Sequence, residues 1–413
     1  MTQKLTTAIL FLLFATSISK QTNATDLVVN TGGAGGTYAS LNAAIAAASS
    51  GDRIIVYPQA NSASYSEGTI SITKSLQILS ANEGAYYAID GNINVAPSTA
   101  GITVTIIGMK LLTGGIQSTI ASPTGARSII NILNDSIVNG AVTFSHNNYN
   151  VTAASSYLGT GFSFLFGKAL GNAVNGPISV STDASVNNPT DTLLIIGNKC
   201  GYYGGGNNGG INWSSTSQYF SMQNNFIQVA GGAATGYGIW VSNSKNSLSG
   251  TNTMYNNTVA KPNGAQIAYA YTLNTGGSSN TDIQNNLYVG AIWYGTYIFS
   301  GGNFNVHYNY GTNFTMSGVT NDGTNIAATN TTLNSEGLVT SVGSNTINGG
   351  TVDSAFADIN LTRNDVGCYG GSYTLDNFFP ITANDWARVI LVTAPRRVLV
   401  NGTINVKAIG YDK

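Results

Sequence analysis

Short apolar runs separated by glycine and asparagine fill most of this chain of 413 residues. Between about residue 58 and residue 371 the runs consist of Ile, Val, Leu, Phe and Tyr, and almost no segment repeats with the spacing of a helix. Apolar runs of about four to eight residues between turn-forming residues are typical of buried β-strands. The pattern therefore predicts an all-β protein made of many short strands.

One segment near the beginning has helical spacing instead. Its apolar residues recur from Tyr38 to Ala48 at intervals of three and four, after a glycine-rich stretch at 32–36 and before Gly51-Asp52. Such spacing predicts an amphipathic helix. The apolar run at 53–58 follows directly. We therefore expect a short helix that leads at once into a buried strand.

An asparagine-led motif recurs along the predicted strands. It begins at Asn134, Asn198, Asn224, Asn256 and Asn285, and the last four copies start 26, 32 and 29 residues apart. A repeat of this length indicates stacked coils, in which each strand pairs with its equivalent in the next coil. Asparagine tolerates the left-handed conformation of a sharp corner, and its amide can bond to the next rung. We predict that these five residues form an internal structural ladder. The alternative is a ligand-binding role for the second column, which comprises Asn225, Asn257 and Asn286.

Both ends of the repeat resemble the pectin-lyase-like superfamily. The order of glycine-rich turn, short helix, Gly51-Asp52 and strand 53–58 is similar to the N-terminal cap of those proteins. The closing sequence Arg363-x-Asp365-x-Gly-x-Tyr resembles their last coil. This resemblance implies a right-handed parallel β-helix, with the helix covering its open end. It also implies that Arg363 and Asp365 satisfy backbone groups rather than catalyse.

Three segments follow from these features. Residues 1–24 have the layout of a secretory signal peptide, with Lys4, an apolar run and small residues before Ala24. Residues 25–371 are expected to be the capped β-helix, and residues 372–413 a separate tail. Two strand-like runs of the tail flank Asn401-Gly402, which is typical of a hairpin. The hairpin either caps the last coil or docks a partner protein.

Charge excludes several classes of partner. Charged residues make up only 8% of the chain and the formal net charge is -1. Because Lys and Arg are not clustered, the sequence argues against nucleic-acid binding and against a polybasic membrane patch. No stretch after the signal-like segment is long and apolar enough to predict a transmembrane helix. We therefore expect a secreted or cell-surface protein. Cys200 and Cys368 are expected to be separate buried thiols, with a disulfide as the open alternative.

The scarcity of charge also bears on catalysis. The β-helix enzymes that the chain resembles are mostly polysaccharide lyases, glycoside hydrolases and pectin esterases, and each needs several ionisable groups on one face. Between Cys200 and Tyr310 the charged side chains are Lys245, Lys261 and Asp282. This favours binding without catalysis, and we expect no cofactor.

The best acid-base candidates lie in the N-terminal half. Asp135 and Lys199 follow equivalent corner asparagines, which would place them two coils, or about 10 Å, apart. If the protein is an enzyme, this pair predicts a polysaccharide lyase that acts on an acidic glycan with calcium. We interpret His307 as a hydrogen-bonded surface or ladder residue rather than an isolated base, and Asp282 as a residue without a catalytic role. Other titratable side chains of the N-terminal loops and coils are Arg127, His146, Lys168, Asp183 and Asp191.

Aromatic residues are abundant in the middle of the chain. We expect the following rings to form a ligand surface: Tyr202, Tyr203, Trp213, Tyr237, Trp240, Trp293, Tyr294 and Tyr297. Flat rings beside amides and hydroxyls suit stacking on sugars, and the same surface would serve as a protein interface. The sequence thus predicts a secreted or cell-surface β-helix that binds polysaccharide or a larger surface protein such as an adhesin.

Overall fold

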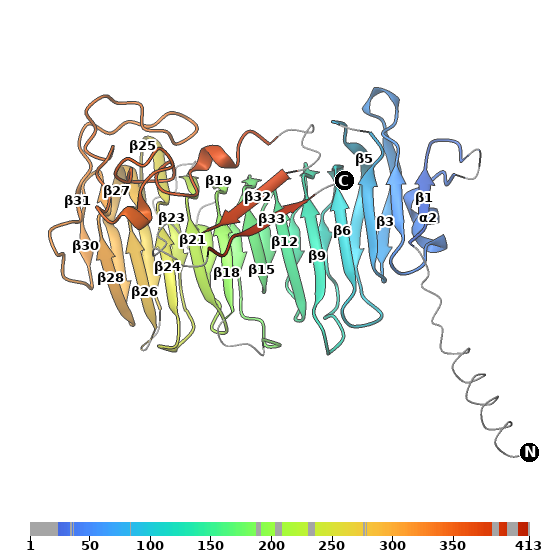
Figure 1. The fold of residues 1–413 in the computed structure, drawn as a ribbon, viewed down its shortest axis with the longest axis horizontal. Helices are drawn as coiled ribbons and strands as arrows, with labels where there is room; N and C mark the ends of the chain where they lie inside the picture. The colour runs from blue at the N-terminus through green and yellow to red at the C-terminus, as the bar shows by residue number, and fades with distance from the viewer. Residues whose placement is uncertain are drawn as a thin grey trace, which may run out of the picture.

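The computed structural model shows a long stack of parallel coils (Figure 1). It describes residues 24–411 apart from 34, 36, 83, 187–190, 203–208, 230–235, 276, 278, 382–387 and 395–403. The predicted signal peptide therefore lies almost wholly outside the described residues. Among the residues that are described, no helix is long and apolar enough to cross a membrane.

One face of the stack is a 12-stranded parallel sheet, which we call sheet A. Each of its strands pairs with the strand one coil before it and the strand one coil after it. In order, they are β1 (Asp26–Val29), β2 (Arg53–Val56), β4 (Leu76–Ser80), β6 (Thr103–Ile107), β9 (Ser128–Leu133), β12 (Tyr149–Ala154), β15 (Gly167–Leu170), β18 (Thr192–Ile196), β21 (Tyr219–Gln223), β24 (Thr251–Tyr255), β26 (Asn280–Gln284) and β28 (Asn303–His307).

The remaining faces form a 19-stranded parallel sheet, sheet B, with two rows of strands. Four long strands run through both rows: β3 (Ser64–Ile72), β5 (Tyr87–Val95), β25 (Thr258–Asn274) and β27 (Leu287–Ser300). The row next to sheet A also holds β7 (Met109–Thr113), β10 (Ser136–Ile137), β13 (Tyr157–Leu158), β16 (Ala173–Val174), β19 (Lys199–Tyr202), β22 (Phe226–Val229), β29 (Tyr310–Gly311) and β31 (Ile326–Ala327). The other row holds β8 (Ile116–Gln117), β11 (Val142–Phe144), β14 (Phe162–Phe164), β17 (Ile178–Val180), β20 (Gly209–Trp213), β23 (Tyr237–Val241) and β30 (Met316–Ser317). This arrangement confirms the predicted right-handed parallel β-helix.

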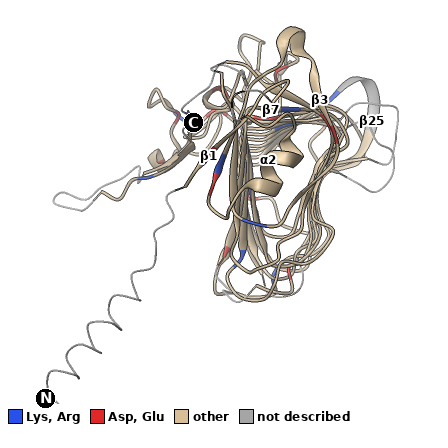
Figure 2. Cartoon of the chain, turned by 90° about the vertical axis from the view of Figure 1, so that its right-hand side faces the viewer, with Lys and Arg blue, Asp and Glu red and all other residues tan. Residues whose placement is uncertain are grey.

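The predicted helix is α2 (Leu41–Ala47), and it lies across the N-terminal end of the stack (Figure 2). Ser40 caps it by accepting a hydrogen bond from the amide of Ala43. Its buried side chains are Leu41, Ala44 and Ile45, and they belong to the same core as the strands. The helix therefore seals the open end of the first coil, as expected.

The interior is a continuous apolar column along the stack. Alternate residues of each strand point inward, so parallel pairing places equivalent side chains above one another, as in the series Ile54, Ile78, Ile106 and Ile132. All four of these side chains are buried. Regular stacking of this kind fills the core with side chains from successive coils and accounts for the repeat in the sequence.

The asparagine ladder is confirmed, but its members are shifted by one residue. Each rung donates from its backbone N–H to the amide oxygen of the next rung, for example Asn198 to Asn225 at 3.0 Å and Asn225 to Asn257 at 3.2 Å. The rungs are Asn172, Asn198, Asn225, Asn257, Asn286, Asn309 and Asn325. Of the five predicted members only Asn198 is a rung, and the second column is structural.

The other predicted ladder residues occupy the corner just before each rung. Asn134, Asn224, Asn256 and Asn285 have φ between 52° and 58°, the left-handed conformation expected of them. Before Asn198 the corner residue is Gly197. A Cβ built at Gly197 would stand 2.2 Å from the Phe378 ring, so this corner needs glycine. The predicted alignment of the five motifs is therefore correct except at Asn198, which is a rung rather than a corner residue.

The corner asparagines hold a segment that runs back along the stack. The last coil strand is β31, well before the predicted boundary at 371, and residues 328–381 then return along the outside of earlier coils (Figure 1). Within this return segment lie the short 3₁₀ helices Ser354–Phe356 and Leu375–Asn377; a third, Ala60–Ser62, lies in an N-terminal loop. Asn224 donates its amide to the carbonyls of Cys368, at 3.0 Å, and Gly370, at 2.6 Å.

The two residues of the closing motif satisfy backbone groups, as the resemblance implied. Arg363 donates to the carbonyls of Gly350 and Gly349, at 2.6 and 3.1 Å, and Asp365 accepts from the amide of Asn348 at 2.6 Å. These contacts lie within the return segment rather than on a last coil. Burial raises the pKa of the Asp365 carboxyl.

The tail forms the predicted hairpin, in which β32 (Arg388–Thr393) pairs antiparallel with β33 (Lys407–Tyr411). Its Asn401-Gly402 turn lies outside the described residues. The hairpin does not cap the last coil. It packs across the outer face of sheet A in the N-terminal half of the molecule (Figure 1).

Both cysteines are free and buried, as predicted. Cys200 belongs to the interior core, whereas Cys368 belongs to the return segment and packs with Leu375 against Phe226 of the coil stack. Burial raises the pKa of each thiol to about 12.

Candidate functional site

Two of the predicted ligand-binding rings face the interior. Trp213 and Tyr297 are each 1% exposed. The indole N–H of Trp213 donates to the carbonyl of Ser215, and the Tyr297 ring stacks on Tyr271 with centroids 4.6 Å apart. Successive side chains of a strand point to opposite faces, and each of these two rings occupies an inward-facing position of its strand. The prediction for these two rings was wrong.

Three further members of that set cannot be placed. Tyr203 lies outside the described residues, and the side chains of Tyr202 and Trp293 are not described either. The remaining three, Tyr237, Trp240 and Tyr294, do lie on the outer surface, where Tyr294 is 66% exposed.

Tyr269 joins those three to form an outer aromatic row on β23, β25 and β27. Tyr237 stacks on Trp240 at 5.8 Å and on Tyr269 at 6.0 Å, and Tyr269 stacks on Tyr294 at 5.6 Å. Because the planes are within 28° of parallel, neighbouring rings cover much of each other's faces. The row thus offers ring edges and hydroxyls along its length.

The predicted acid-base pair is not assembled. Asp135 is 0% exposed and occupies the ladder position of its coil, where it accepts hydrogen bonds from the amides of Met109, at 2.7 Å, and Leu133, at 3.1 Å. Three coils, not two, separate it from Lys199, because the ladder runs from Asp135 through Ser156 and Asn172 to Asn198. Asp135 occupies the same position in its coil as the inward-facing rung Asn198. Lys199 follows Asn198 directly, and because neighbouring side chains point to opposite faces, Lys199 points outward.

Lys199 lies in a groove between the coil stack and the return segment, which we call the Lys199 groove. Its ammonium pairs with the Glu336 carboxylate and stands 4.2 Å from the centre of the Phe379 ring. The groove has a volume of about 630 Å³, and its lining also includes Tyr157 and Asp376. Lys199 thus faces outward into this groove. Its partners, Glu336 and Phe379, were not identified from the sequence.

Other predicted titratable residues do not line this groove. Arg127 stands 3.9 Å over the Phe166 ring and 4.0 Å from the buried Asp183 carboxylate. The Lys168 side chain projects from β15 of sheet A, and burial lowers its pKa. His146 contacts the Ser118 hydroxyl at 3.5 Å. These residues do not converge with Lys199 in a common cleft.

Sheet A has an outer column whose character changes along its length. In the N-terminal half, one register position is occupied by an apolar stripe made of Leu79, Ile107, Leu133, Ala154, Leu170 and Ile196. The hairpin and Phe378 cover this stripe. At the same position the next coils carry Gln223, Tyr255, Gln284 and His307.

A second polar column runs beside the first. It consists of Ser221, Thr253, Asp282 and Asn305. The two columns are linked by hydrogen bonds, such as Gln223 to Ser221 at 2.7 Å and Tyr255 to Asp282 at 2.5 Å. We call these eight residues the polar face. Burial and then the charge of Asp282 raise the pKa of Tyr255 well above its ordinary range, so this hydroxyl stays protonated.

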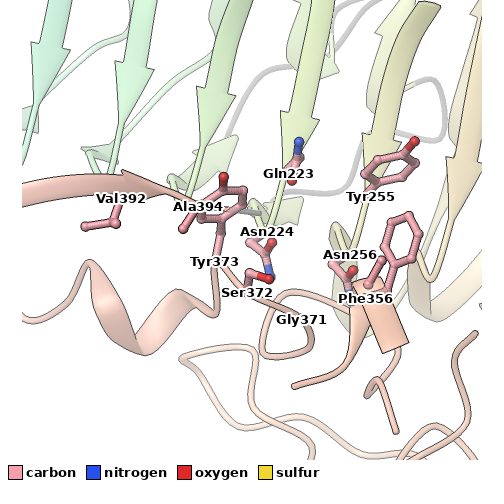
Figure 3. A pocket seen from close by; sticks show the side chains of 11 residues that line it. Gln223, Asn224, Tyr255, Asn256, Phe356, Gly371, Ser372, Tyr373, Val392 and Ala394 are labelled. Carbon is pink, nitrogen blue, oxygen red and sulfur yellow. The ribbon is translucent and has the colours of Figure 1, made fainter. Parts of the chain in front are cut away.

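At the boundary between stripe and polar face lies a hollow of about 370 Å³, the amide pocket (Figure 3). Its amides come from Gln223, Asn224 and Asn256, and its rings from Tyr255, Phe356 and Tyr373. Charged side chains are absent from its lining within the described chain. The return segment and the hairpin close one side of the pocket, and β21 and β24 form the other (Figure 3).

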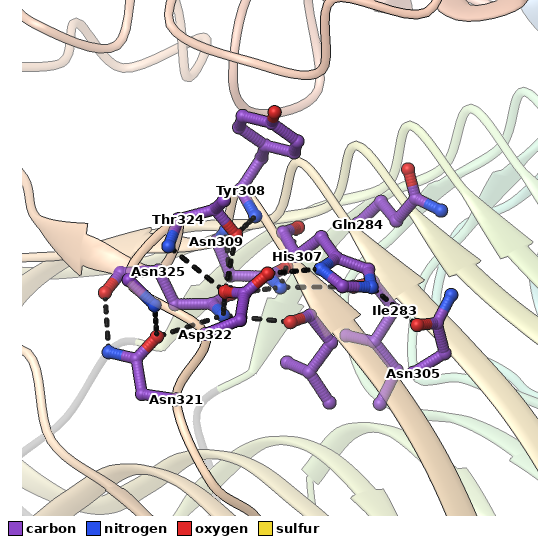
Figure 4. Close-up of polar contacts among 12 residues, drawn as sticks. Ile283, Gln284, Asn305, His307, Tyr308, Asn309, Asn321, Asp322, Thr324 and Asn325 are labelled. Atoms are coloured by element: carbon purple, nitrogen blue, oxygen red, sulfur yellow. Dashed lines mark hydrogen bonds and ion pairs between the residues drawn. The ribbon is translucent and has the colours of Figure 1, made fainter.

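His307 ends the polar face in a network with Asp322 (Figure 4). Its Nδ1 lies 2.6 Å from Asp322 Oδ2, and its Nε2 faces Oδ1 of Asn305. The Asn305 amide nitrogen donates to Asp282 at 3.0 Å, which fixes the direction of that amide. Both ring nitrogens therefore face oxygen atoms of neighbouring side chains. His307 and Asp282 are thus connected through Asn305.

The sequence held a usable signal for part of this face. The ladder asparagines Asn286 and Asn309 are 23 residues apart, and the same offset aligns Asp282 with Asn305. With the second asparagine column as the ladder, the sequence places the side chains of Asp282 and Asn305 next to each other. No comparable signal places Glu336 beside Lys199, because they are 137 residues apart.

Comparisons with known proteins bear only on the fold. No protein family model matches the sequence, and the search of curated proteins gave no match. One solved structure to which the chain is similar is the crystal structure of pectate lyase Pel9A, with 15% identity and a TM-score of 0.46. The similarity covers 87% of this chain and 98% of that one.

Proposed function

We propose that this β-helix binds polysaccharide, without catalysing a reaction, along the polar face and in the amide pocket. The observation that carries the proposal is the change in the outer column of sheet A. Where the hairpin covers the column its residues are aliphatic, and where the column emerges they are Gln223, Tyr255, Gln284 and His307. Amides and hydroxyls in regular rows match the hydroxyl groups of a sugar chain.

The amide pocket supplies the complementary apolar contacts. Phe356 packs edge-on against Tyr255 at 5.3 Å, and Tyr373 lines the pocket near the hairpin (Figure 3). Ring faces and edges pack against the C–H surfaces of sugars, while amides fix their orientation. Since the lining that is described carries no charged side chain, we expect neutral polysaccharides to bind there better than acidic ones.

The alternative of a lyase acting on an acidic glycan rested on Asp135 and Lys199. With Asp135 inside the ladder and Lys199 paired with Glu336, the pair that motivated this alternative is separated. The prediction of a cell-surface protein partner remains a prediction, and the outer aromatic row is the surface that would serve it.

Retention on immobilised polysaccharides tests the proposal. A panel of neutral and acidic polysaccharides would be used with the mature protein and with Phe356→Ala and Gln223→Ala. Loss of the Phe356 ring is expected to weaken retention about five- to thirtyfold, as truncation of a well-packed contact ring costs about 1–2 kcal/mol.

Tyr294→Ala is the matched control, because it removes an exposed ring of the outer aromatic row. If this control loses retention while both pocket variants keep it, the polar face and the amide pocket are not the binding surface. Incubation with the same panel, read as new reducing ends and as ultraviolet absorbance of unsaturated ends, tests the absence of catalysis. A product signal lost in Lys199→Ala would establish the lyase instead.

A further inference from the structure

We propose that the Lys199 groove is a second binding site, which takes a glycan carrying protonated amino groups. This goes beyond the proposed function because the groove shares no lining residue with the amide pocket. The variants that test the two sites are also different.

The dimensions and lining of the groove suit an oligosaccharide. Its volume of about 630 Å³ falls within the range of about 300–1,000 Å³ that is usual for small-molecule sites. Rings of Tyr86, Tyr157, Tyr369 and Phe379 line it, and Tyr157 is 38% exposed. Aromatic side chains on opposite walls can pack against the flat faces of sugar rings, and the phenol hydroxyls can bond to their substituents.

The charge of the groove selects the kind of glycan. Its charged side chains, within the described chain, are Lys199, Glu336 and Asp376. Lys199 is neutralised by Glu336 and held against the Phe379 ring. Asp376 is exposed and makes no ion pair among the described residues. The groove therefore has one net negative charge, which repels a uronate and attracts an ammonium group.

The architecture of the groove wall favours a glycan over a basic peptide. The wall of the coil stack is formed by β10, β13, β16 and β19, and each of these strands is already paired on both sides. An extended peptide gains much of its affinity by adding to a free strand edge. This groove has side chains rather than an open edge on that wall, so it suits a ligand recognised through its hydroxyl and amino groups.

The test compares a glucosamine tetramer with its N-acetylated counterpart, a galacturonate tetramer and tetralysine, by isothermal titration calorimetry at pH 6. The glucosamine tetramer is expected to bind most tightly. Asp376→Asn should weaken its binding about two- to fivefold, whereas Lys199→Met should tighten it by a similar factor, because each change alters the net charge of the groove by one at a partly exposed position. If Asp376 and Lys199 had merely structural roles, both substitutions would weaken the binding of the glucosamine tetramer.

Lys110→Met is the matched control, since Lys110 lies in the same outward column but outside the groove. It should bind the glucosamine tetramer like the parent protein, and thermal melting would verify that all variants are folded. Equal affinity for the acetylated tetramer, tighter binding of tetralysine, or weaker binding by Lys199→Met would each overturn the proposal. None of these outcomes affects the polar face, which Phe356→Ala tests separately.

Discussion

The two halves of sheet A share one backbone register but present opposite surfaces. In the N-terminal half the outer column from Leu79 to Ile196 is aliphatic and buried beneath the hairpin. In the C-terminal half the same column, from Gln223 to His307, is polar and hydrogen-bonded sideways to its neighbour. The coil stack itself is the same in both halves. What differs is whether another part of the chain covers the sheet.

This difference shows how a repetitive scaffold acquires a site. Parallel pairing places the outward side chains of successive coils about 4.8 Å apart, so an apolar stretch of a column needs a cover, whereas a polar stretch can face water. The amide pocket lies where the cover ends. A boundary of this kind has rings from the covering segment and amides from the strands, which neither half has alone.

The largest effect should come from a polar substitution under the hairpin. Leu170 belongs to the apolar stripe and is fully buried beneath its cover. We expect Leu170→Asn to destabilise the protein by about 3–5 kcal/mol, because it loses apolar burial and places an amide in an apolar contact. Urea denaturation followed by circular dichroism would measure this loss.

Gln223→Leu is the matched control, since it places an apolar residue at the same register position in the polar half. Its effect on the free energy of unfolding, measured by the same urea denaturation, should be below about 1 kcal/mol. If the two variants were equally mild, the hairpin would not be a sealing cover and the comparison of the two halves would fail.

An intermediate effect is expected in the ladder, which is common to both halves. The Asn257 side chain accepts from the backbone N–H of Asn225 at 3.2 Å and donates to the carbonyl of Met222 at 2.9 Å. Asn257→Ala would leave these buried groups without partners, at a cost of about 2–3 kcal/mol. Asn198→Ala, in the half of the stack that the hairpin covers, should reduce the stability by the same amount, as measured by thermal melting. Unequal costs would mean that the hairpin contributes to the ladder as well as to the stripe.

The smallest effect concerns pH at the end of the polar face. Although burial raises the pKa of Asp322, hydrogen bonds from Thr324 and the contact with His307 lower it more, so its pKa lies below the ordinary value. A lowered pKa means that the ionised carboxylate stabilises the folded state above about pH 4 and that this contribution is lost as the pH falls further. The side chain is 36% exposed, so the contribution is small.

Melting temperatures of the parent protein and Asp322→Asn at several pH values would check this. The parent should melt higher than the variant at pH 6, and the difference in melting temperature should narrow progressively as the pH falls below about 4. If the difference in melting temperature instead widened toward acid pH, the ionised carboxylate of Asp322 would not be a stabilising partner of His307.

Much of the fold could be predicted because its signals are local and repeated. Short apolar runs, an asparagine-led motif in several coils and one helix-spaced segment indicated a capped coil stack, and each signal lies within about one coil of sequence. The ladder was misplaced by one residue because both asparagines of each pair are conformationally plausible at a corner. Only the register decides which amide points inward.

The sequence by itself determined the parallel coil stack, its cap and its uncharged, amide-rich surface. The tertiary structure decided the positions of the return segment and the hairpin, and with them both hollows. The physical reason is distance along the chain: Asn224 bonds to Cys368, 144 residues away, and Lys199 pairs with Glu336, 137 residues away. Such contacts depend on which outer column the tail covers, and no local pattern of hydrophobic and polar residues encodes that choice.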